Sequence, residues 1–424
     1  MRSFHFHVFI FSYFMFTLSV STQEPASNPE SSNVYSLRRA IDLALSKNEN
    51  LAAKEEIVNS IQFAQKHAGV WQNPSLAFSY YRKSTEGQYG NSYVASVAQP
   101  FYFPGKISLR EEIVGHDLQI GRLGLERERL FIQYQVVNLS YQYQTLKKIL
   151  EHTERRVQRL QTIQIYIRNR PRVAPQVRAE IKIIQSRLKI AQKDMALLKA
   201  SAEGVWVKLN LYLNLKGKPN LQLPEISPGT SLDLLALESS VERNFSLKEI
   251  RVMKMRTESE QKLADKSIYP DFAVTAFVQD EYSNANDRFY GIGGTFNLPL
   301  FDRQQHASSS LGSKIAAQEQ EAKYLEKWLK QELRAMHALF ESARANIERY
   351  PIADISKEEK EFIYLDSEFR KGRVQVVTYL EAEAAAYNNV MIAWENQARF
   401  VELYSDLLFL TGQKDFTLGG EDAP

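Results

Sequence analysis

Two copies of one sequence pattern make up most of the chain, and this repetition constrains the fold more than any other feature. Each copy predicts a helix, two alternating strands and two long helices joined by a turn. The first repeat spans residues 35–214 and the second spans residues 232–412. Residues 215–231 between them are rich in Pro and Gly and predict a linker, and residues 413–424 form a C-terminal tail. The chain is therefore expected to be an internally duplicated helix-strand-strand-long helix-helix unit.

Matching residues mark the same points in both repeats. Asn48 and Leu51 lie in the first helix of the first repeat, and Asn244 and Leu247 lie in the first helix of the second. A turn that contains proline and two strands follow in each repeat. The predicted strands cover about residues 76–84, 91–101, 271–280 and 288–299. The predicted long helices cover about residues 106–165, 175–214, 303–371 and 374–411, the third being interrupted at Pro351.

The long helices have the spacing of coiled coils. Apolar residues recur every seven positions in the first of them, at Leu118, Leu125, Ile132, Leu139 and Leu146. Such a repeat keeps one stripe facing a partner helix and supercoils the pair. A proline-free helix of some sixty residues is roughly 90 Å long at about 1.5 Å per residue. That length does not fit inside a compact domain, although the spacing by itself is also compatible with an ordinary helical bundle.

The predicted strands alternate between an apolar or aromatic face and a small or polar face. This alternation is typical of a barrel wall with lipid outside and water inside, although a soluble hairpin packed on a helix would alternate similarly. The residues expected to face lipid are Phe78, Val274, Ile292 and Phe296. Four strands are too few to close a barrel, and an open edge in lipid would leave backbone groups without partners. The sequence therefore predicts a mixed α and transmembrane β fold, with a pooled β-barrel on a long coiled-coil α-helical tube.

The N-terminus resembles an export signal that ends near residue 21. Arg2 is the only charged residue before Glu24, and an apolar run of thirteen residues extends from Val8 to Val20. That run is too short for a membrane-spanning helix, and a buried N-terminal strand is the alternative. With a signal peptide at residues 1–21, the mature protein would lie outside the cytoplasm and would cross a membrane only through its strands.

Several classes of chemistry have no support in the sequence. The chain has no cysteine, which excludes disulfides, thiolate metal sites and a thiol nucleophile. Its histidines lack the spacing of a zinc-binding helix, and the common nucleotide-binding and hydrolase motifs are missing. The net charge is only +3, without a basic tract for nucleic acid. We expect no catalytic residue, no metal site, no cofactor and no enzyme activity.

The chain resembles the TolC family of outer-membrane efflux proteins over roughly residues 35–412. The most specific segment is residues 369–383, where Gly372 precedes Leu380, Glu381 and Ala382. This segment is similar to the family's hairpin turn, which has a glycine followed eight or nine residues later by leucine, an acid and alanine. Residues 166–180 repeat the pattern with Asn169 in place of the glycine, because asparagine also tolerates a left-handed turn.

The resemblance implies a homotrimer in the outer membrane, with twelve pooled strands and a periplasmic tunnel of helices. It also implies a passive duct for small molecules or metal ions, with a periplasmic adaptor and an inner-membrane pump as further partners. Glu381 matches an acid that lines the family's pore constriction, and Thr378 stands where a second acid would be. The turns expected to dock an adaptor contain Asn169, Arg170, Arg172, Gly372 and Arg373.

Other interpretations of these residues and of the architecture remain open at this stage. Glu381 fits a solvated or inter-helix position equally well, and the turn arginines also fit an exposed basic helix end. The same architecture serves type I protein secretion, which the sequence does not distinguish from efflux. A protein of another class, a soluble periplasmic coiled-coil scaffold, would have strands that fold away from lipid.

Overall fold

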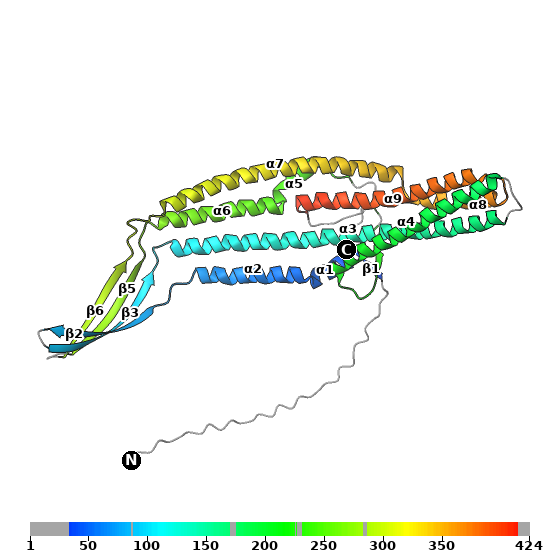
Figure 1. Ribbon diagram of the computed structural model, residues 1–424. Coiled ribbons are helices and arrows are strands. Elements are labelled where there is room, and N and C mark those ends of the chain that lie inside the picture. Colours follow the sequence, from blue (N-terminus) through cyan, green and yellow to red (C-terminus); the bar gives the residue numbers. More distant parts are fainter. Residues whose placement is uncertain are drawn as a thin grey trace, which may run out of the picture.

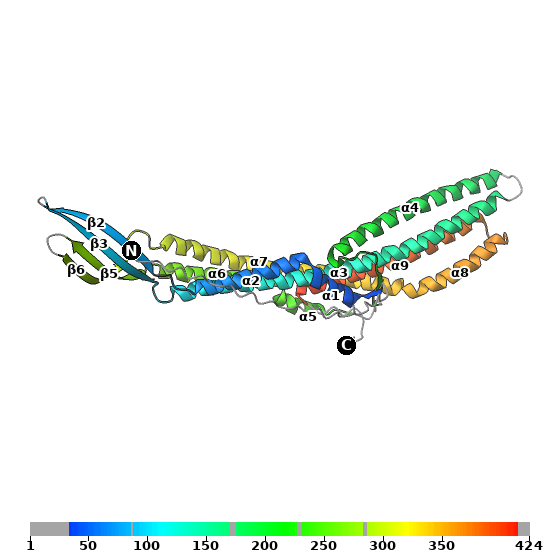
Figure 2. The same ribbon diagram turned by 90° about the horizontal axis from the view of Figure 1, so that it is seen from below.

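The computed structural model describes residues 34–85, 88–169, 175–224, 226, 231–282 and 286–413. These residues form an elongated molecule with a β-sheet at one end and a group of helix ends at the other (Figure 1; Figure 2). The expected combination of long helices and antiparallel strands is confirmed. The predicted signal peptide at residues 1–21, part of the linker and residues 414–424 of the tail lie outside the described residues.

Among the described residues, the first half of the chain contains three strands and four helices. They are β1 (Val34–Ser36), α1 (Leu37–Lys47), α2 (Glu49–Ala68), β2 (Ser75–Thr85), β3 (Gln88–Phe101), α3 (Lys106–Arg168) and α4 (Pro175–Leu213). α3 has 63 residues, which corresponds to roughly 95 Å at about 1.5 Å per residue. It packs against α2 and α6 near the sheet and against α4 and α9 further away, so one helix connects the two ends of the molecule.

The second half contains short helices, two further strands of the larger sheet and three long helices. It contains β4 (Asn220–Gln222), α5 (Leu234–Ser240), the 3-10 helix η1 (Val241–Arg243), α6 (Phe245–Lys266), β5 (Phe272–Tyr282), β6 (Asn286–Phe296), α7 (Gln305–Arg349), α8 (Ile352–Arg370) and α9 (Val376–Thr411). Pro351 separates α7 from α8, because proline has no N–H and its ring collides with the preceding helical turn. The helix expected at residues 374–411 begins at Val376, since Gln375 is extended.

Matching asparagines start the helices that lead into the sheet in both halves. The Asn48 side chain accepts a hydrogen bond from the backbone N–H of Leu51 at 3.0 Å, at the start of α2. The Asn244 side chain accepts from the backbone N–H of Leu247 at 3.1 Å, at the start of α6. Asparagine is a favoured N-cap because its side-chain oxygen satisfies an N–H that has no partner within the helix. The two caps explain why a new helix starts at Glu49 and at Phe245.

The strands form two sheets of different size. β1 and β4 are parallel and form a small sheet beside α1. The larger sheet is antiparallel and has the order β2-β3-β5-β6. β2 and β6 are its outer strands, and neither pairs on its outer side with any other strand among the described residues. The sheet therefore has two unpaired edges.

A buried lysine joins the large sheet to the helices. Lys106, the first residue of α3, is 5% exposed, and its ammonium group donates to Asp271 Oδ1 at 2.9 Å and to the Tyr269 carbonyl at 2.8 Å. The backbone N–H of Phe103 donates to the same carboxylate oxygen at 2.8 Å. The Phe103 and Tyr269 rings stack with their centroids 4.4 Å apart. These contacts fix the direction in which the sheet leaves the helical body.

Candidate functional site

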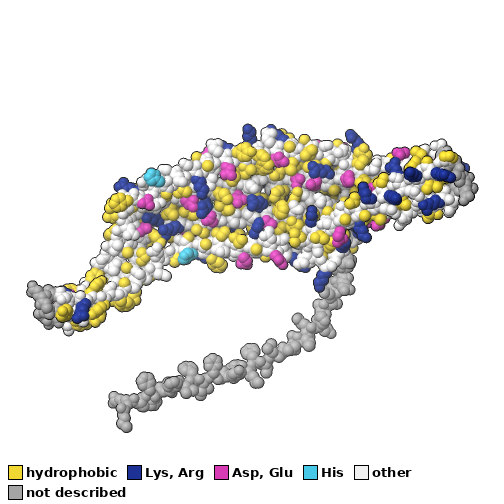
Figure 3. Space-filling model, in the orientation of Figure 1, with side chains coloured by type: hydrophobic (Ala, Val, Ile, Leu, Met, Phe, Trp, Pro, Cys, Tyr) yellow, Lys and Arg dark blue, Asp and Glu magenta, His cyan; other side chains and the backbone are white. Residues whose placement is uncertain are grey.

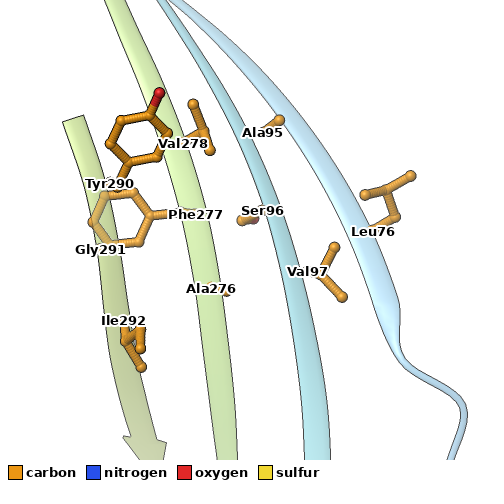
Figure 4. A pocket seen from close by; sticks show the side chains of 10 residues that line it. All are labelled: Leu76, Ala95, Ser96, Val97, Ala276, Phe277, Val278, Tyr290, Gly291 and Ile292. Atoms are coloured by element: carbon orange, nitrogen blue, oxygen red, sulfur yellow. The ribbon is translucent and has the colours of Figure 1, made fainter. Parts of the chain in front are cut away.

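One face of the large sheet carries all four residues expected to face lipid. Directly opposed residues of neighbouring strands point to the same face, and the register places Phe78, Val274, Ile292 and Phe296 on one face. The row of opposed residues near the middle of this face is Leu76, Val97, Ala276 and Ile292 (Figure 4). Phe78 is 75% exposed and Ile292 is 83% exposed, so this apolar face is uncovered in the single chain. We call it the apolar sheet face.

Two rows of aromatic rings bound the apolar sheet face. The row nearest the helices is formed by Trp71, Phe101, Phe272 and Phe296, with neighbouring ring centroids 5.3–6.0 Å apart. The row nearest the hairpin ends is formed by Tyr80, Tyr93 and Tyr282, with neighbouring centroids 5.2 and 6.0 Å apart.

The spacing of the two aromatic rows matches the apolar band of a membrane barrel. Phe101 and Tyr93 lie eight residues apart on β3 (93 to 101), which is about 26 Å along the strand. A strand tilted by about 40° would convert this into a height of roughly 20 Å, comparable with the ~25 Å apolar band between aromatic girdles. Two opposite charges, Asp280 and Arg288, lie at the level of Tyr93 and pair with each other at 2.5 Å. The rows therefore separate an apolar zone from charged groups.

The opposite face of the sheet is mostly small or polar, apart from the aromatic residues Tyr81, Phe277 and Phe289. Thr275, Gly293 and Thr295 lie on it, as the alternation predicts. Phe277 also points to this face, and its ring lies across Gly291 of the neighbouring strand. A β-carbon at Gly291 would lie 2.3 Å from the Phe277 ring, so only glycine leaves room for the ring there.

At the other end of the molecule, α8 and α9 are joined by a turn at Gly372. Gly372 has the left-handed conformation that the sequence predicts, with φ of 75°. Its N–H donates to the Phe369 carbonyl at 2.9 Å, and the Arg373 N–H donates to the Glu368 carbonyl at 3.0 Å. This pair of hydrogen bonds is a Schellman motif, which ends a helix sharply. A β-carbon at Gly372 would meet no described atom within 4 Å, so only the backbone conformation favours glycine.

Two exposed basic side chains beside this turn pair with a largely buried acid. Glu368 accepts hydrogen bonds from Lys371 at 2.7 Å and from Arg373 at 2.9 Å. These two hydrogen bonds lower the pKa of the Glu368 carboxyl, which stays ionised at neutral pH. The side chain of Arg373 remains 69% exposed, so its guanidinium is accessible to a partner. Figure 3 shows several Lys and Arg side chains over this helical end and hydrophobic side chains over the sheet end.

The turn between α3 and α4 differs from the sequence-based expectation in one respect. Asn169 has a right-handed conformation with φ of −85°, not the left-handed one expected by analogy with Gly372. Its N–H still donates to the Ile165 carbonyl at 3.2 Å, so it ends α3 without a positive φ. Asparagine tolerates a left-handed conformation, but it also adopts the right-handed one, as Asn169 does here. Arg170 and Arg172 lie outside the described residues.

Glu381 and Thr378 are both exposed on α9, near the Gly372 turn. Glu381 Oε1 accepts a hydrogen bond from Arg187 Nη2 of α4 at 3.1 Å. The two side chains are 68% and 38% exposed. Glu381 therefore contacts a neighbouring helix and solvent at once, and sequence reasoning did not identify Arg187 as its partner.

A second acid on the same helix is buried and was missed by sequence reasoning. The side chain of Glu383 is 2% exposed, and its Oε2 accepts from Arg156 Nη2 at 3.1 Å and from Arg156 Nε at 3.2 Å. Its Oε1 has no hydrogen-bond partner among the described atoms, although it lies 3.0 Å from Arg156 Nε. The Arg156 guanidinium also lies over the Tyr387 ring, 4.2 Å from its centroid. The pair ties α3 to α9 inside the helical end.

Apolar packing surrounds this ion pair. Four helices meet in one core, to which α3 contributes Leu160 and Ile167, α4 contributes Ile184, and α9 contributes Tyr379. α8 contributes Phe369, whose ring stacks on Tyr379 at 4.4 Å. Figure 2 shows α3, α4, α8 and α9 extending together away from the sheet. The helical end is thus a four-helix bundle with an unusual buried charge pair.

The described part of the chain offers no arrangement typical of a metal centre. Within residues 34–413, apart from the gaps stated above, no three His, Asp or Glu side chains are grouped so that they could hold a metal ion. No helix in those residues is both long and apolar enough to cross a membrane.

No protein-family model and no curated protein sequence matches the chain. Solved structures do match it along most of their length. A membrane protein from Pseudomonas aeruginosa aligns over 88% of this chain and 93% of its own, with 14% identity and a TM-score of 0.73. The CmeC outer membrane channel of Campylobacter jejuni aligns over 90% of this chain and 87% of its own, with 14% identity and a TM-score of 0.69.

A third structure represents a channel described as open. The MtrE outer membrane channel of Neisseria gonorrhoeae aligns over 89% of this chain and 88% of its own, with 14% identity and a TM-score of 0.68. At this level of identity, the alignments show a shared fold. The single-chain fold expected of a TolC-type outer-membrane channel is therefore confirmed.

Proposed function

We propose that this chain, which has the fold of TolC-type outer-membrane channels, is a subunit of the outer-membrane duct of an efflux system. The observation that carries the proposal is the apolar sheet face, bounded by two aromatic rows, at the end of helices roughly 95 Å long. The duct would be passive and would carry small molecules or metal ions from a periplasmic adaptor and an inner-membrane pump to the exterior. No catalytic residue or cofactor is part of this proposal.

The duct would be a homotrimer with a periplasmic helical tunnel. A single sheet of four strands has two unpaired edges, and unpaired backbone groups have no partners in lipid. Three copies would pool twelve strands, which is enough to close a barrel. The two sequence repeats, residues 35–214 and 232–412, would then alternate around the tube.

The function is tested by expressing the full chain and locating it. We expect it in the outer-membrane fraction as a trimer in detergent, and we expect stable conductance when the purified trimer is added to planar bilayers. Recovery as a soluble periplasmic monomer would support the scaffold interpretation and contradict a duct. Loss of drug or metal tolerance on deletion would favour efflux, whereas loss of a secreted protein would favour type I secretion.

The turn at Gly372 is the proposed docking point for the adaptor, together with Arg373 and the α3–α4 turn around Asn169, Arg170 and Arg172. Replacing Gly372 by Val should incur a left-handed penalty of about 1–2 kcal/mol, which the core contacts of the four-helix bundle outweigh. We expect a normal amount of outer-membrane trimer but weaker adaptor cross-linking and weaker efflux. Gly372→Asn, which tolerates a positive φ better, is the matched control. If efflux falls only when the trimer itself disappears, the turn is structural.

Glu381 is the proposed pore-lining acid, and Arg187 partly neutralises it. A ring of three like charges raises the local concentration of cations, so Glu381→Gln should reduce cation selectivity measured from reversal potentials at low salt. Arg187→Gln should have the opposite effect because it frees the carboxylate, and Thr378→Glu should increase selectivity further. Equal cation selectivity in the unmodified trimer and in all three variants would mean that Glu381 only links neighbouring helices.

A further inference from the structure

We propose that the unpaired edge of β6 pairs with the unpaired edge of β2 in a second copy of this chain, in one antiparallel register. Residue x of β6 would lie opposite residue 376 − x of β2 in the neighbouring copy. The proposal rests on the proposed barrel and adds the alignment of its subunits. The register follows from a repeat that can be measured inside the single chain.

The repeat has constant offsets on either side of the hairpins. Asn48 and Asn244, which both cap helices, are 196 positions apart (244 − 48), and Pro74 and Pro270 have the same separation (270 − 74). Residues of β2 therefore correspond to residues of β5 at an offset of 196.

The second offset applies to β3 and β6. Pro100 and Pro299 are 199 positions apart (299 − 100). Gly105 and Gln304, which precede α3 and α7, have the same separation (304 − 105), and both have left-handed conformations, with φ of 88° and 58°. A non-glycine residue with positive φ is uncommon, so Gln304 is a specific marker of equivalence.

The two observed hairpins provide a check on these offsets. In the first hairpin, Ser75 lies opposite Ala98. Adding 196 to position 75 gives Asp271, and adding 199 to position 98 gives Asn297. The offsets therefore predict that Asp271 lies opposite Asn297 in the second hairpin. The observed pairing continues this register, because Phe272 lies opposite Phe296 and the Asn297 N–H donates to the Asp271 carbonyl at 3.3 Å. The offsets thus reproduce a register that was not used to derive them.

The same offsets convert the β3–β5 pairing into a pairing between copies. Residue 96 of β3 lies opposite residue 277 of β5. Adding 199 to position 96 of β3 gives the equivalent Thr295 of β6, and subtracting 196 from position 277 of β5 gives the equivalent Tyr81 of β2. Thr295 would therefore lie opposite Tyr81 of the neighbouring copy. The observed pair of residues 95 and 278 likewise places Gly294 opposite Arg82.

This register has two consequences for the joined sheet. It keeps Phe296 and Tyr80, both on the apolar sheet face, on the same side of the joined sheet, whereas a shift by one residue would reverse the faces. It also extends β6 to Leu300, because the fully paired β3 continues to the equivalent Phe101. The exposed Leu298 and Leu300, each 64% exposed, would then continue the apolar sheet face of β6.

Disulfide trapping tests the register with little background, because the chain has no cysteine. The full chain would carry Thr295→Cys with Tyr81→Cys or, separately, Gly294→Cys with Arg82→Cys, and membranes would be oxidised. The two pairs are consecutive in the register, so one is a hydrogen-bonded pair and the other is a non-hydrogen-bonded pair. The Cα atoms are closer in the non-hydrogen-bonded pair. Within one chain the two edges are three strand spacings, or about 14 Å, apart, which is too far for a disulfide. We expect covalent dimers and trimers from both pairs.

Shifted pairs are the matched controls. Thr295→Cys with Ser79→Cys, or with Lys83→Cys, moves the register by two residues while keeping the same face, and should give several-fold less cross-linked product. A shifted pair that cross-links more efficiently overturns the register. A membrane trimer in which no pair cross-links overturns the edge pairing itself. If the unmodified chain forms no membrane oligomer, the proposed duct fails instead. If Thr295→Cys prevents insertion into the membrane, the pair Gly294→Cys with Arg82→Cys tests the register instead. Gly294→Cys with Tyr80→Cys is then the shifted control.

Discussion

Replacing Ile292 by Arg is expected to destabilise the membrane-inserted assembly by about 2–4 kcal/mol per subunit. Ile292 lies near the middle of the apolar sheet face, between the two aromatic rows, and is 83% exposed in the single chain. A guanidinium at the middle of a bilayer loses its hydration without gaining a partner, which is the source of this cost. Three copies in one trimer would multiply the effect, so little folded trimer should remain in the membrane.

Two arginine substitutions serve as controls, one at another depth on the same face of the sheet and one on the opposite face. Val274→Arg lies closer to the helix-proximal aromatic row and should be less destabilising than Ile292→Arg, because the cost falls toward the membrane surface. Thr275→Arg lies on the opposite face, toward the expected aqueous lumen, and should be tolerated. The measurement is the amount of heat-modifiable trimer in outer membranes and its urea midpoint in lipid vesicles. Equal effects at positions 274 and 275 would contradict a lipid-facing wall.

The shared face of the strands could be predicted from the sequence because it depends on a local rule. Side chains alternate along any strand, so Phe78 and Phe296 could be assigned to the apolar face before their strands were known to belong to one sheet. The helix end at Gly372 is also local, since glycine adopts a positive φ at little cost. The analogy with Asn169 failed because asparagine allows a left-handed conformation without imposing it.

The charge partners could not be predicted because they are distant in the sequence. Glu381 and Arg187 are 194 positions apart, and Glu383 and Arg156 are 227 positions apart. Only the packing of α9 against α3 and α4 decides which acid is buried. One signal was available: Leu380, Glu383, Tyr387 and Val390 follow the alternating spacing of three and four that marks a buried stripe.

The pair of Glu383 and Arg156 carries the second large expected effect. Glu383→Ala would leave the Arg156 guanidinium buried without its carboxylate, in a bundle where its side chain is only 9% exposed. Breaking one side of a buried ion pair costs about 3–5 kcal/mol, because the remaining charge keeps its desolvation penalty and loses its partner. Opening of the helical end should therefore become easier by roughly a hundredfold or more, since each 1.4 kcal/mol is a factor of ten.

Hydrogen exchange of the backbone amides measures this local opening without unfolding the trimer. Glu383→Ala should reduce protection in α9 around residues 379–390 and in the facing part of α3, while the sheet stays unchanged. Glu381→Ala, two residues away on the same helix, removes only an exposed ion pair and should change protection by less than about 1 kcal/mol.

The double variant Arg156→Met with Glu383→Leu decides whether the cost comes from an unpaired charge. Both side chains then become apolar and of similar volume, so no buried charge remains, and such replacements are often neutral or stabilising. We expect protection in α3 and α9 to recover to at least the level of the unmodified chain. If the double variant is as poorly protected as Glu383→Ala, the loss is one of packing, and the ion pair does not stabilise the helical end in the way its burial suggests. If it recovers, the chain keeps this pair at no advantage in stability over an apolar core, and its role must lie in fixing how α9 aligns with α3.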